Sequence, residues 1–270
     1  MSIRPKSADA VGKMRAAGQV VAEVLVRLQD MARPGVTTAE LDDAAVRKMA
    51  EGGARSLFRG QPHPRGGPPY PGNICVSVNE ELVHGIPGPR RIAGGDVVSV
   101  DVGVEKDGWC ADAARTFAVG DVSLDVRDLV ETTARALEVV RREARAGVIW
   151  SAVAGRIQTL VEGRGFSIVR EYVGHGIGRQ MWEPPRVPNY VGADMSRDDF
   201  LLAEGMTLAV EPMVNMGRRQ VREKEDGWTV VAADGKPCAH FEDTFVIRPD
   251  GAEPLTRLPA GGAEVNPERG

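Results

Sequence analysis

The sequence of 270 residues contains little cysteine. Its three cysteines, Cys75, Cys110 and Cys238, are odd in number, far apart and form no zinc-type pair. This usage favours a reducing compartment, and we expect a cytoplasmic protein. The sequence also lacks any apolar stretch long enough to span a bilayer, and no apolar signal segment follows Met1–Lys6. Membrane insertion and secretion are therefore not expected.

Clusters of positive charge are also missing. The formal net charge is −4, and no run of Lys and Arg stands out. Nucleic acids and anionic membranes are therefore not expected as partners. What is present is the composition of an ordinary globular protein. The length slightly exceeds that of a usual single domain, but α/β folds of this size often form one unit.

Helical patterns occur at four places. Apolar or small residues recur every three or four positions over residues 11–28, and Pro34-Gly35 ends this first helix. A second helix runs to about Glu51, a third covers residues 129–140, and a fourth follows Val148. The expected N-caps are Ser7, Thr37 in a capping box with Glu40, and Ser123 or Asp125 for the third helix.

One helix joint is repeated. Ala144-Arg-Ala-Gly-Val148 echoes Ala32-Arg-Pro-Gly-Val36, and each phrase lies between two helices. The repeat predicts a single domain, residues 1–256, built of two similar halves at about 7–120 and 121–256. A functional site would then lie between the halves, as clefts between similar units often do.

Strand patterns occupy most of the remaining sequence. The expected strands are Asn73–Val78, Ser167–Gly174, Met206–Val214, and a closing hairpin of Trp228–Val231 with Ala239–Ile247. Glycines on both sides of His175 would allow a close approach of neighbouring backbone. Residues 257–270 are rich in Gly, Pro, Ala and charge, and we expect a disordered tail there.

Two aspartates lie on a pair of alternating strands joined by the turn Lys106-Asp107-Gly108. If the hairpin is centred between Lys106 and Asp107, Asp101 and Asp112 sit directly opposite each other, with Cβ atoms roughly 5 Å apart. Like charges in that position repel. They need compensation from metal ions, a nearby cation or a shared proton.

Five short blocks carry a resemblance to a known family. They are Val100–Gly103, Ala111–Thr116, Gly174–Gly178, Val210–Met213 and Phe241–Thr244, and they stand in one order. Together they resemble the type I methionine aminopeptidases of peptidase family M24, over residues 7–256. The resemblance implies an α+β pita-bread fold with pseudo-twofold halves and a curved antiparallel sheet covered by helices.

The resemblance implies that five residues bind two divalent metal ions: Asp101, Asp112, His175, Glu211 and Glu242. It further implies that Asp112 and Glu242 bridge the ions, Asp101 holds one ion, and His175 with Glu211 holds the other. Four carboxylates and one imidazole are a mostly hard ligand set, which suits Mn, Fe, Co or Zn.

The implied activity is removal of N-terminal methionine from peptides and nascent proteins. In this reading a metal-bridging hydroxide attacks the first peptide bond. Glu211 would shuttle the proton of the attacking water, and His84 would hydrogen-bond the substrate near the scissile amide. The implied partners are peptide and nascent-protein N-termini, with the ribosome as a place of encounter, and the implied state is a monomer.

The residues expected to contact substrate besides His84 are Tyr70, Cys75, Met181, Trp182 and Trp228. A soft thioether packs well beside sulfur and aromatic rings, although Trp and Cys are often simply buried. Trp182 departs from the family pattern, which has a second histidine there. Trp can donate one hydrogen bond but cannot accept one or carry a proton, so we expect reduced methionine removal, altered specificity, or both.

Two further positions depart from the pattern. Gly67 replaces an additional aromatic residue, which predicts a wider or looser pocket and altered methionine selectivity. Asp243 stands where His or Asn is more usual, and strand alternation predicts that it points away from the ligand Glu242.

Two alternative functions stay open from the sequence. One is a divergent aminopeptidase of the same fold with changed specificity, such as an X-Pro type. The other is a catalytically weak pita-bread protein that only binds. A binding role alone gives no reason to keep carboxylates clustered, which is costly in free energy.

Overall fold

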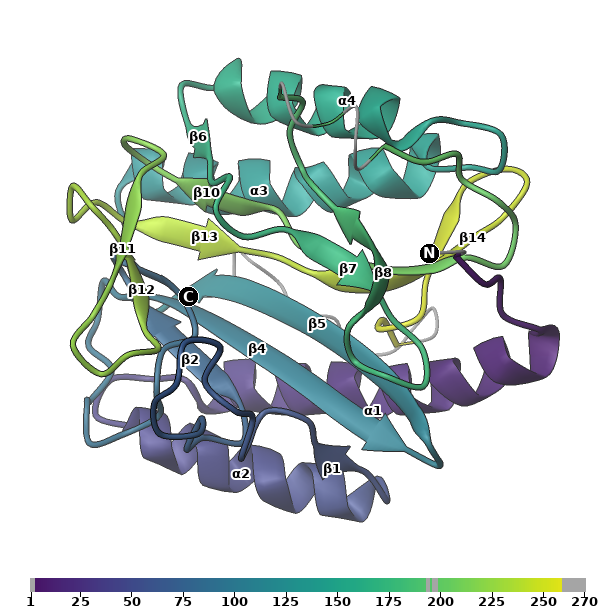
Figure 1. Ribbon diagram of the computed structural model, residues 1–270. Coiled ribbons are helices and arrows are strands. Elements are labelled where there is room, and N and C mark those ends of the chain that lie inside the picture. The colour runs from purple at the N-terminus through teal and green to yellow at the C-terminus, as the bar shows by residue number, and fades with distance from the viewer. Residues whose placement is uncertain (1–2, 193–194, 196–198, 259–270) are drawn as a thin grey trace.

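The computed structural model describes residues 3–192, 195 and 199–258 (Figure 1). Within this part of the chain the helices are α1 (Ala8–Met31), α2 (Thr38–Glu51), α3 (Leu124–Glu143) and α4 (Trp150–Glu162). The strands are β1 (Arg55–Ser56), β2 (Cys75–Val78), β3 (Glu81–Val83), β4 (Val97–Lys106), β5 (Trp109–Ala118), β6 (Ser167–Ile168), β7 (Gly174–Gly176), β8 (Glu183–Val187), β9 (Thr207–Val210), β10 (Met213–Asn215), β11 (Val221–Glu223), β12 (Val230–Ala232), β13 (Cys238–His240), β14 (Asp243–Ile247) and β15 (Ala252–Pro254). The expected disordered tail, 257–270, lies outside the described residues from position 259 onward.

The N-caps follow the sequence signals. The Ser7 side chain accepts a hydrogen bond from the Ala10 amide at the start of α1. Thr37 and Glu40 make both bonds of the capping box at α2. Ser123, rather than Asp125, caps α3. Each such cap stabilises its helix by about 1 kcal/mol, because it satisfies an amide that has no partner within the helix.

The strands pair in four small sheets, and every ladder among them is antiparallel. The sheet order β1-β4-β2, with β5 also paired to β4, places the aspartate hairpin at its centre. A second sheet has the order β15-β14-β9-β7-β8. An isolated bridge between Ala114 of β5 and Glu242, just before β14, joins the two sheets.

Helix pairs cover the strands in two layers. In Figure 1, α3 and α4 lie above the strands and α1 and α2 lie below them. One buried apolar cluster joins α1 and α2 to β2, β4 and β5, and another joins α3 and α4 to the strands of the second sheet. Gly35 and Gly147, at the two repeated joints, both have positive φ. The division into two related halves stays a prediction.

The register of the aspartate hairpin differs from the prediction. Asp101 faces Ala114, and Asp112 faces Gly103, so the two aspartates are diagonal neighbours rather than direct partners. Asp107 and Gly108 both have positive φ, which makes them the central residues of a two-residue turn. The turn centre therefore lies one residue further along than expected. This shifts each strand partner by two positions and keeps both aspartates on the same face.

Three other strand predictions were too simple. The stretch Ser167–Gly174 is interrupted, and only its ends belong to β6 and β7. The stretch Met206–Val214 is split between β9 and β10 at Glu211-Pro212, where proline has no amide to donate to a ladder. The predicted closing hairpin is wrong: β12 pairs with β11 and β3, β13 pairs with β10, and β14 pairs with β9 and β15.

Among the described residues, no helix combines the length and apolar character needed to cross a membrane.

Candidate metal centre

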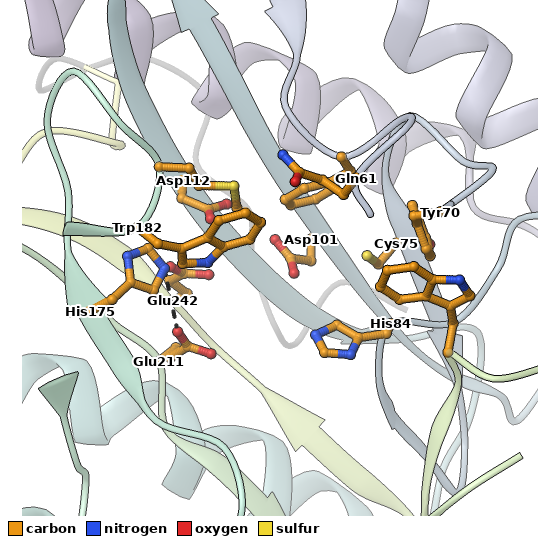
Figure 2. Close-up of a pocket in the computed structure, with 13 residues that line it drawn as sticks. Gln61, Tyr70, Cys75, His84, Asp101, Asp112, His175, Trp182, Glu211 and Glu242 are labelled. Atoms are coloured by element: carbon orange, nitrogen blue, oxygen red, sulfur yellow. Dashed lines mark ion pairs between the residues drawn. The ribbon is translucent and has the colours of Figure 1, made fainter. Parts of the chain in front are cut away.

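The five predicted ligand residues come together in one cavity, where strands of both sheets meet (Figure 2). Asp101 lies in β4 and Asp112 in β5, while His175 lies in β7. Glu211 directly follows β9, and Glu242 directly precedes β14. Residues separated by up to 141 positions thus face one space. Figure 2 shows His175, Glu211 and Glu242 on one side of Asp101, and Tyr70 and Cys75 on the other.

The ligand atoms are close enough to share a cation. One atom from each of Asp112, His175 and Glu242 lies within 4.8 Å of the others, a spacing that could hold a metal ion. Glu211 adds its Oε1, which is 3.8 Å from Nε2 of His175. The Asp101 carboxylate lines the same cavity.

Hydrogen bonds to backbone hold the ligand strands in place. The Thr244 hydroxyl accepts from the Asp112 amide at 3.0 Å and donates to the Asp112 carbonyl at 2.9 Å. The Ala114 amide donates to the carbonyl of Glu242 at 3.2 Å, and the Glu242 amide donates back at 2.9 Å. These bonds fix the β5 ligand against the β14 ligand.

The ring of His175 is oriented for metal binding. Its Nδ1 lies 2.9 Å from the Gly176 carbonyl, which can only accept, so Nδ1 carries the proton and Nε2 offers a lone pair to the cavity. The flanking glycines permit close strand packing, as predicted. A Cβ at Gly174 would lie 2.3 Å from the Ala209 carbonyl oxygen, and one at Gly176 would lie 2.2 Å from that of Pro184.

The carboxylates are buried close to one another. Burial, followed by the neighbouring carboxylates, raises the pKa values of Asp101, Glu211 and Glu242 well above their ordinary range. Burial likewise raises the pKa of Asp112 to about 7. Three oxygens, one each on Asp101, Asp112 and Glu242, are buried without a hydrogen-bond partner. Orphaned carboxylate oxygens gathered around an imidazole lone pair fit divalent cations.

An apolar cluster forms the other end of the cavity. Phe58, Tyr70, Cys75 and Met181 are buried together, and Trp228 packs against them. The Tyr70 and Trp228 rings meet edge to face at 5.2 Å, and the Tyr70 hydroxyl donates to the Gly85 carbonyl at 2.9 Å. The structure therefore brings the predicted pocket residues together beside the carboxylates.

His84 and Trp182 lie at the mouth of the cavity. Burial lowers the pKa of His84 to about 4, so its imidazole is neutral near pH 7. His84 has a φ of +59° and lies edge to face with Tyr172. Trp182 is 54% exposed, and its ring lies 6.4 Å from that of His175.

The two other departures from the family pattern have structural partners. Asp243 points away from the cavity, as predicted, and forms buried ion pairs with Arg115 and Arg257. His63 packs edge to face on Trp228, and a side chain at Gly67 would contact the His63 ring. His63 therefore takes up space beside Gly67.

The sequence reasoning missed three residues at the site. Phe58 and Gln61 line the cavity from the loop after β1, where no periodic pattern singles them out. His240 is 2% exposed and places Nε2 at 3.9 Å from Oε2 of Glu211. Burial lowers the pKa of His240 to about 3, so this ring is neutral. The available signal was its position two residues before Glu242 in the strand expected over Ala239–Ile247, where alternate residues share a face.

Comparison with known proteins places the chain in a family. The model of metallopeptidase family M24 matches residues 12–249. The chain belongs to this family. It is 44% identical over 253 residues to methionine aminopeptidase 1 of Bacillus subtilis (strain 168), an alignment covering 94% of this chain and 98% of the relative. Membership of a metallopeptidase family implies use of a divalent metal, and the cluster around Asp112 fits one.

Solved structures agree with that assignment. The crystal structure of methionine aminopeptidase from Thermotoga maritima matches with a TM-score of 0.88 and 39% identity, covering 95% of this chain and 100% of that one. Xaa-Pro dipeptidase from Bacillus anthracis matches with a TM-score of 0.73 and 23% identity, covering 94% of this chain and 62% of that one. The latter likeness shows the fold alone. The resemblance and the pita-bread fold class predicted from the sequence are thus confirmed.

Proposed function

We propose that this M24 protein is a methionine aminopeptidase that uses two divalent metal ions to release N-terminal methionine from peptides and nascent proteins. One observation carries the proposal: a buried cluster of carboxylates and an imidazole opens directly onto an apolar space lined by sulfur and aromatic rings. The first part suits hydrolysis, and the second suits a thioether side chain.

The metal ions would be held by Asp101, Asp112, His175, Glu211 and Glu242, in the ligand arrangement set out above. Bound there, divalent cations would polarise the first peptide carbonyl and make a water molecule acidic. Their identity, as Co, Mn, Fe or Zn, is left open by this donor set.

The protein side chains would supply the remaining steps. Glu211 would take the proton of the attacking water and pass it to the leaving amine. His84, neutral at the cavity mouth, would donate a hydrogen bond near the scissile amide. The methionine side chain would enter the cluster of Tyr70, Cys75 and Met181 with Trp228 at its edge.

The decisive experiment measures methionine release from a peptide that begins Met-Gly, with Mn²⁺, Fe²⁺ or Co²⁺ supplied in turn and a chelator as control. We expect metal-dependent release, and loss of both release and stoichiometric metal in Asp112→Asn. Asp107→Asn is the matched control, because it removes a carboxylate from the same hairpin at an exposed turn with positive φ, which Asn tolerates.

Each alternative predicts a different outcome. Hydrolysis of X-Pro peptides but not of Met-Gly peptides would indicate an X-Pro specificity. No hydrolysis, and no bound metal in the purified protein, would favour a protein that only binds. The 44% identity to a methionine aminopeptidase, against 23% to an Xaa-Pro dipeptidase, favours the proposed activity.

We also propose a monomer that meets nascent N-termini in the cytoplasm, near the ribosome. These points follow from the family resemblance, and size-exclusion chromatography with light scattering tests the monomer directly.

A further inference from the structure

Glu211 lies between two imidazoles. Its Oε1 is 3.8 Å from Nε2 of His175, and its Oε2 is 3.9 Å from Nε2 of His240. The proposed function accounts for the first contact but gives no role to the second. Among the described residues that line the cavity, His240 is absent, and its side chain is 2% exposed.

The two imidazoles differ in what they present to the Glu211 carboxylate: one offers a lone pair and the other an N–H group. His175 donates through Nδ1 to Gly176, so its Nε2 has a lone pair and cannot donate to Glu211. A cation between them would satisfy both. The Nε2 of His240 is buried, has no hydrogen-bond partner, and lies 3.9 Å from a carboxylate oxygen of Glu211. A buried ring nitrogen facing a carboxylate is satisfied when it carries the proton.

The backbone around His240 is held firmly. The Thr116 hydroxyl accepts from the His240 amide at 2.9 Å and donates to its carbonyl at 2.8 Å. His240 also pairs with Met213 across the β10–β13 ladder, two residues after Glu211. The ring is therefore anchored to the segment that carries the carboxylate.

We propose that His240 is a positioning residue for Glu211: its Nε2–H donates to Oε2 and thereby directs Oε1 toward the metal centre. The 3.9 Å between these atoms exceeds hydrogen-bond length, so we expect it to shorten when Oε1 of Glu211 and Nε2 of His175 hold a cation. The carboxylate then has one oxygen for the metal and the proton, and one oxygen fixed by the protein. Partners of this kind around metal ligands typically affect metal affinity or activity by about 10–100-fold.

Two substitutions distinguish a role of His240 as a hydrogen-bond donor from a role in packing. His240→Gln keeps an N–H donor but changes the shape, whereas His240→Phe keeps a ring of similar size but removes the donor. If His240 positions Glu211 by donation, the Phe variant should lose about 10–100-fold in Mn²⁺ affinity and in kcat, with KM little changed, while the Gln variant should keep most of both. If His240 only fills space, the order of the two variants is reversed, and the proposal fails.

The predicted change in kcat rests on the proposed function. Two further measurements do not require turnover and therefore test the role of His240 separately. Titration of the protein with Mn²⁺ by calorimetry gives the affinity, and the visible absorption spectrum of the Co²⁺ form reports on the ligand geometry. We expect both to change in His240→Phe and to resemble the parent in His240→Gln. If the parent binds metal but releases no methionine, the function fails while this inference can still hold.

A double-mutant cycle provides the final check. In a Glu211→Ala background, His240→Phe should cause no further loss of Mn²⁺ affinity, because the group it positions is gone. An additional loss equal to that seen in the parent would show that His240 acts independently of Glu211 and would overturn the proposal. Thermal unfolding of each variant confirms that it is folded.

Discussion

Asp112 and Gly103 face each other across the β4–β5 ladder, and Gly103 leaves the space that the Asp112 carboxylate occupies. A Cβ at position 103 would lie 3.3 Å from Oδ1 of Asp112 and 2.8 Å from a ring carbon of Phe58. One glycine thus gives room both to a metal ligand and to the wall of the apolar pocket.

The first prediction concerns this glycine. Gly103→Ala should displace Phe58 and the Asp112 carboxylate, lowering Mn²⁺ affinity and methionine release and destabilising the fold by about 1–3 kcal/mol through overpacking. Calorimetry and urea unfolding measure both effects. Gly12→Ala is the control: its Cβ would meet nothing within 4 Å in α1, so it should stabilise by about 0.5–1 kcal/mol. Unchanged metal affinity in Gly103→Ala would contradict the prediction.

The second prediction concerns Trp182. Trp182→His restores a side chain that can accept a hydrogen bond or carry a proton at the cavity mouth. We expect faster methionine release, altered preference for the second residue, or both, measured over a peptide panel. Trp182→Phe serves as the control, because it reduces bulk without adding a polar group. Turnover that is unchanged in Trp182→His on every peptide would show the prediction to be wrong.

The third prediction concerns the N-terminal segment. Lys6 forms an ion pair at 2.7 Å with Glu183, whose other oxygen accepts from the amides of Arg179 and Gln180. The same loop carries Met181 and Trp182. Lys6→Met should therefore loosen the pocket wall and raise KM for Met-Gly peptides, by a change of about 1 kcal/mol or roughly fivefold, with kcat little affected.

Lys13→Met is the matched control for the third prediction, because its pair with Asp9 is exposed and lies on α1. Equal effects of the two substitutions on KM would mean that the Lys6 contact has no specific role in the pocket.

The fourth prediction concerns Asp243, which is fully buried between Arg115 and Arg257. Asp243→Ala removes the carboxylate that pairs with Arg115 and leaves Arg257 paired with Glu138 alone, and should cost about 3–5 kcal/mol in the free energy of unfolding. Asp243→Asn should cost less, because it still offers an oxygen to Arg115 and to the Thr256 hydroxyl. Urea unfolding measures both variants. An Ala variant as stable as the Asn variant would contradict this account of the ion pairs.

The fifth prediction concerns pH. The pKa of Asp112 in the folded, metal-free protein is raised to about 7 from 3.8, chiefly by burial. Its stabilising contribution is therefore present below the unfolded value and is lost as the pH rises through about 7. In the presence of a chelator, the free energy of unfolding of the parent should fall relative to that of Asp112→Asn between about pH 4 and pH 7, by a few kcal/mol.

Metal should reverse that trend, because a cation favours the ionised carboxylates. The gain in stability on adding Mn²⁺ is thus expected to increase over the same pH range. A parent and an Asp112→Asn variant whose stabilities run parallel in the chelator would show that the buried carboxyl does not titrate in this way.

The sequence predicted the residues of the candidate site better than it predicted the register of the β4–β5 hairpin. The five candidate ligands, predicted because their types and order are distinctive, line one cavity, and strand alternation correctly turned Asp243 away from it. The aspartate register was missed by one turn position, since Asp107 and not Lys106 adopts the positive φ that a tight turn requires. The dipeptide Asp107-Gly108 is a preferred two-residue hairpin turn, so the observed register could have been predicted from the sequence.

The missed residues depend on contacts between distant segments. His240 meets Glu211 only because β13 pairs with β10, and Phe58 reaches the cavity only because β1 pairs with β4. No short-range signal in the sequence encodes those pairings. The break at Glu211-Pro212, by contrast, follows directly from proline and could have been predicted.

The bridge between Ala114 and Glu242 joins an early part of the chain to a late one. Asp101 and Asp112 are made early, on a hairpin complete at residue 118, but their partners arrive on later strands, the last at residue 242. Until then the hairpin carries two carboxylates without the other ligands. A tightly held ion would therefore report that the chain has folded up to Glu242, and metal loading would be a late step in maturation.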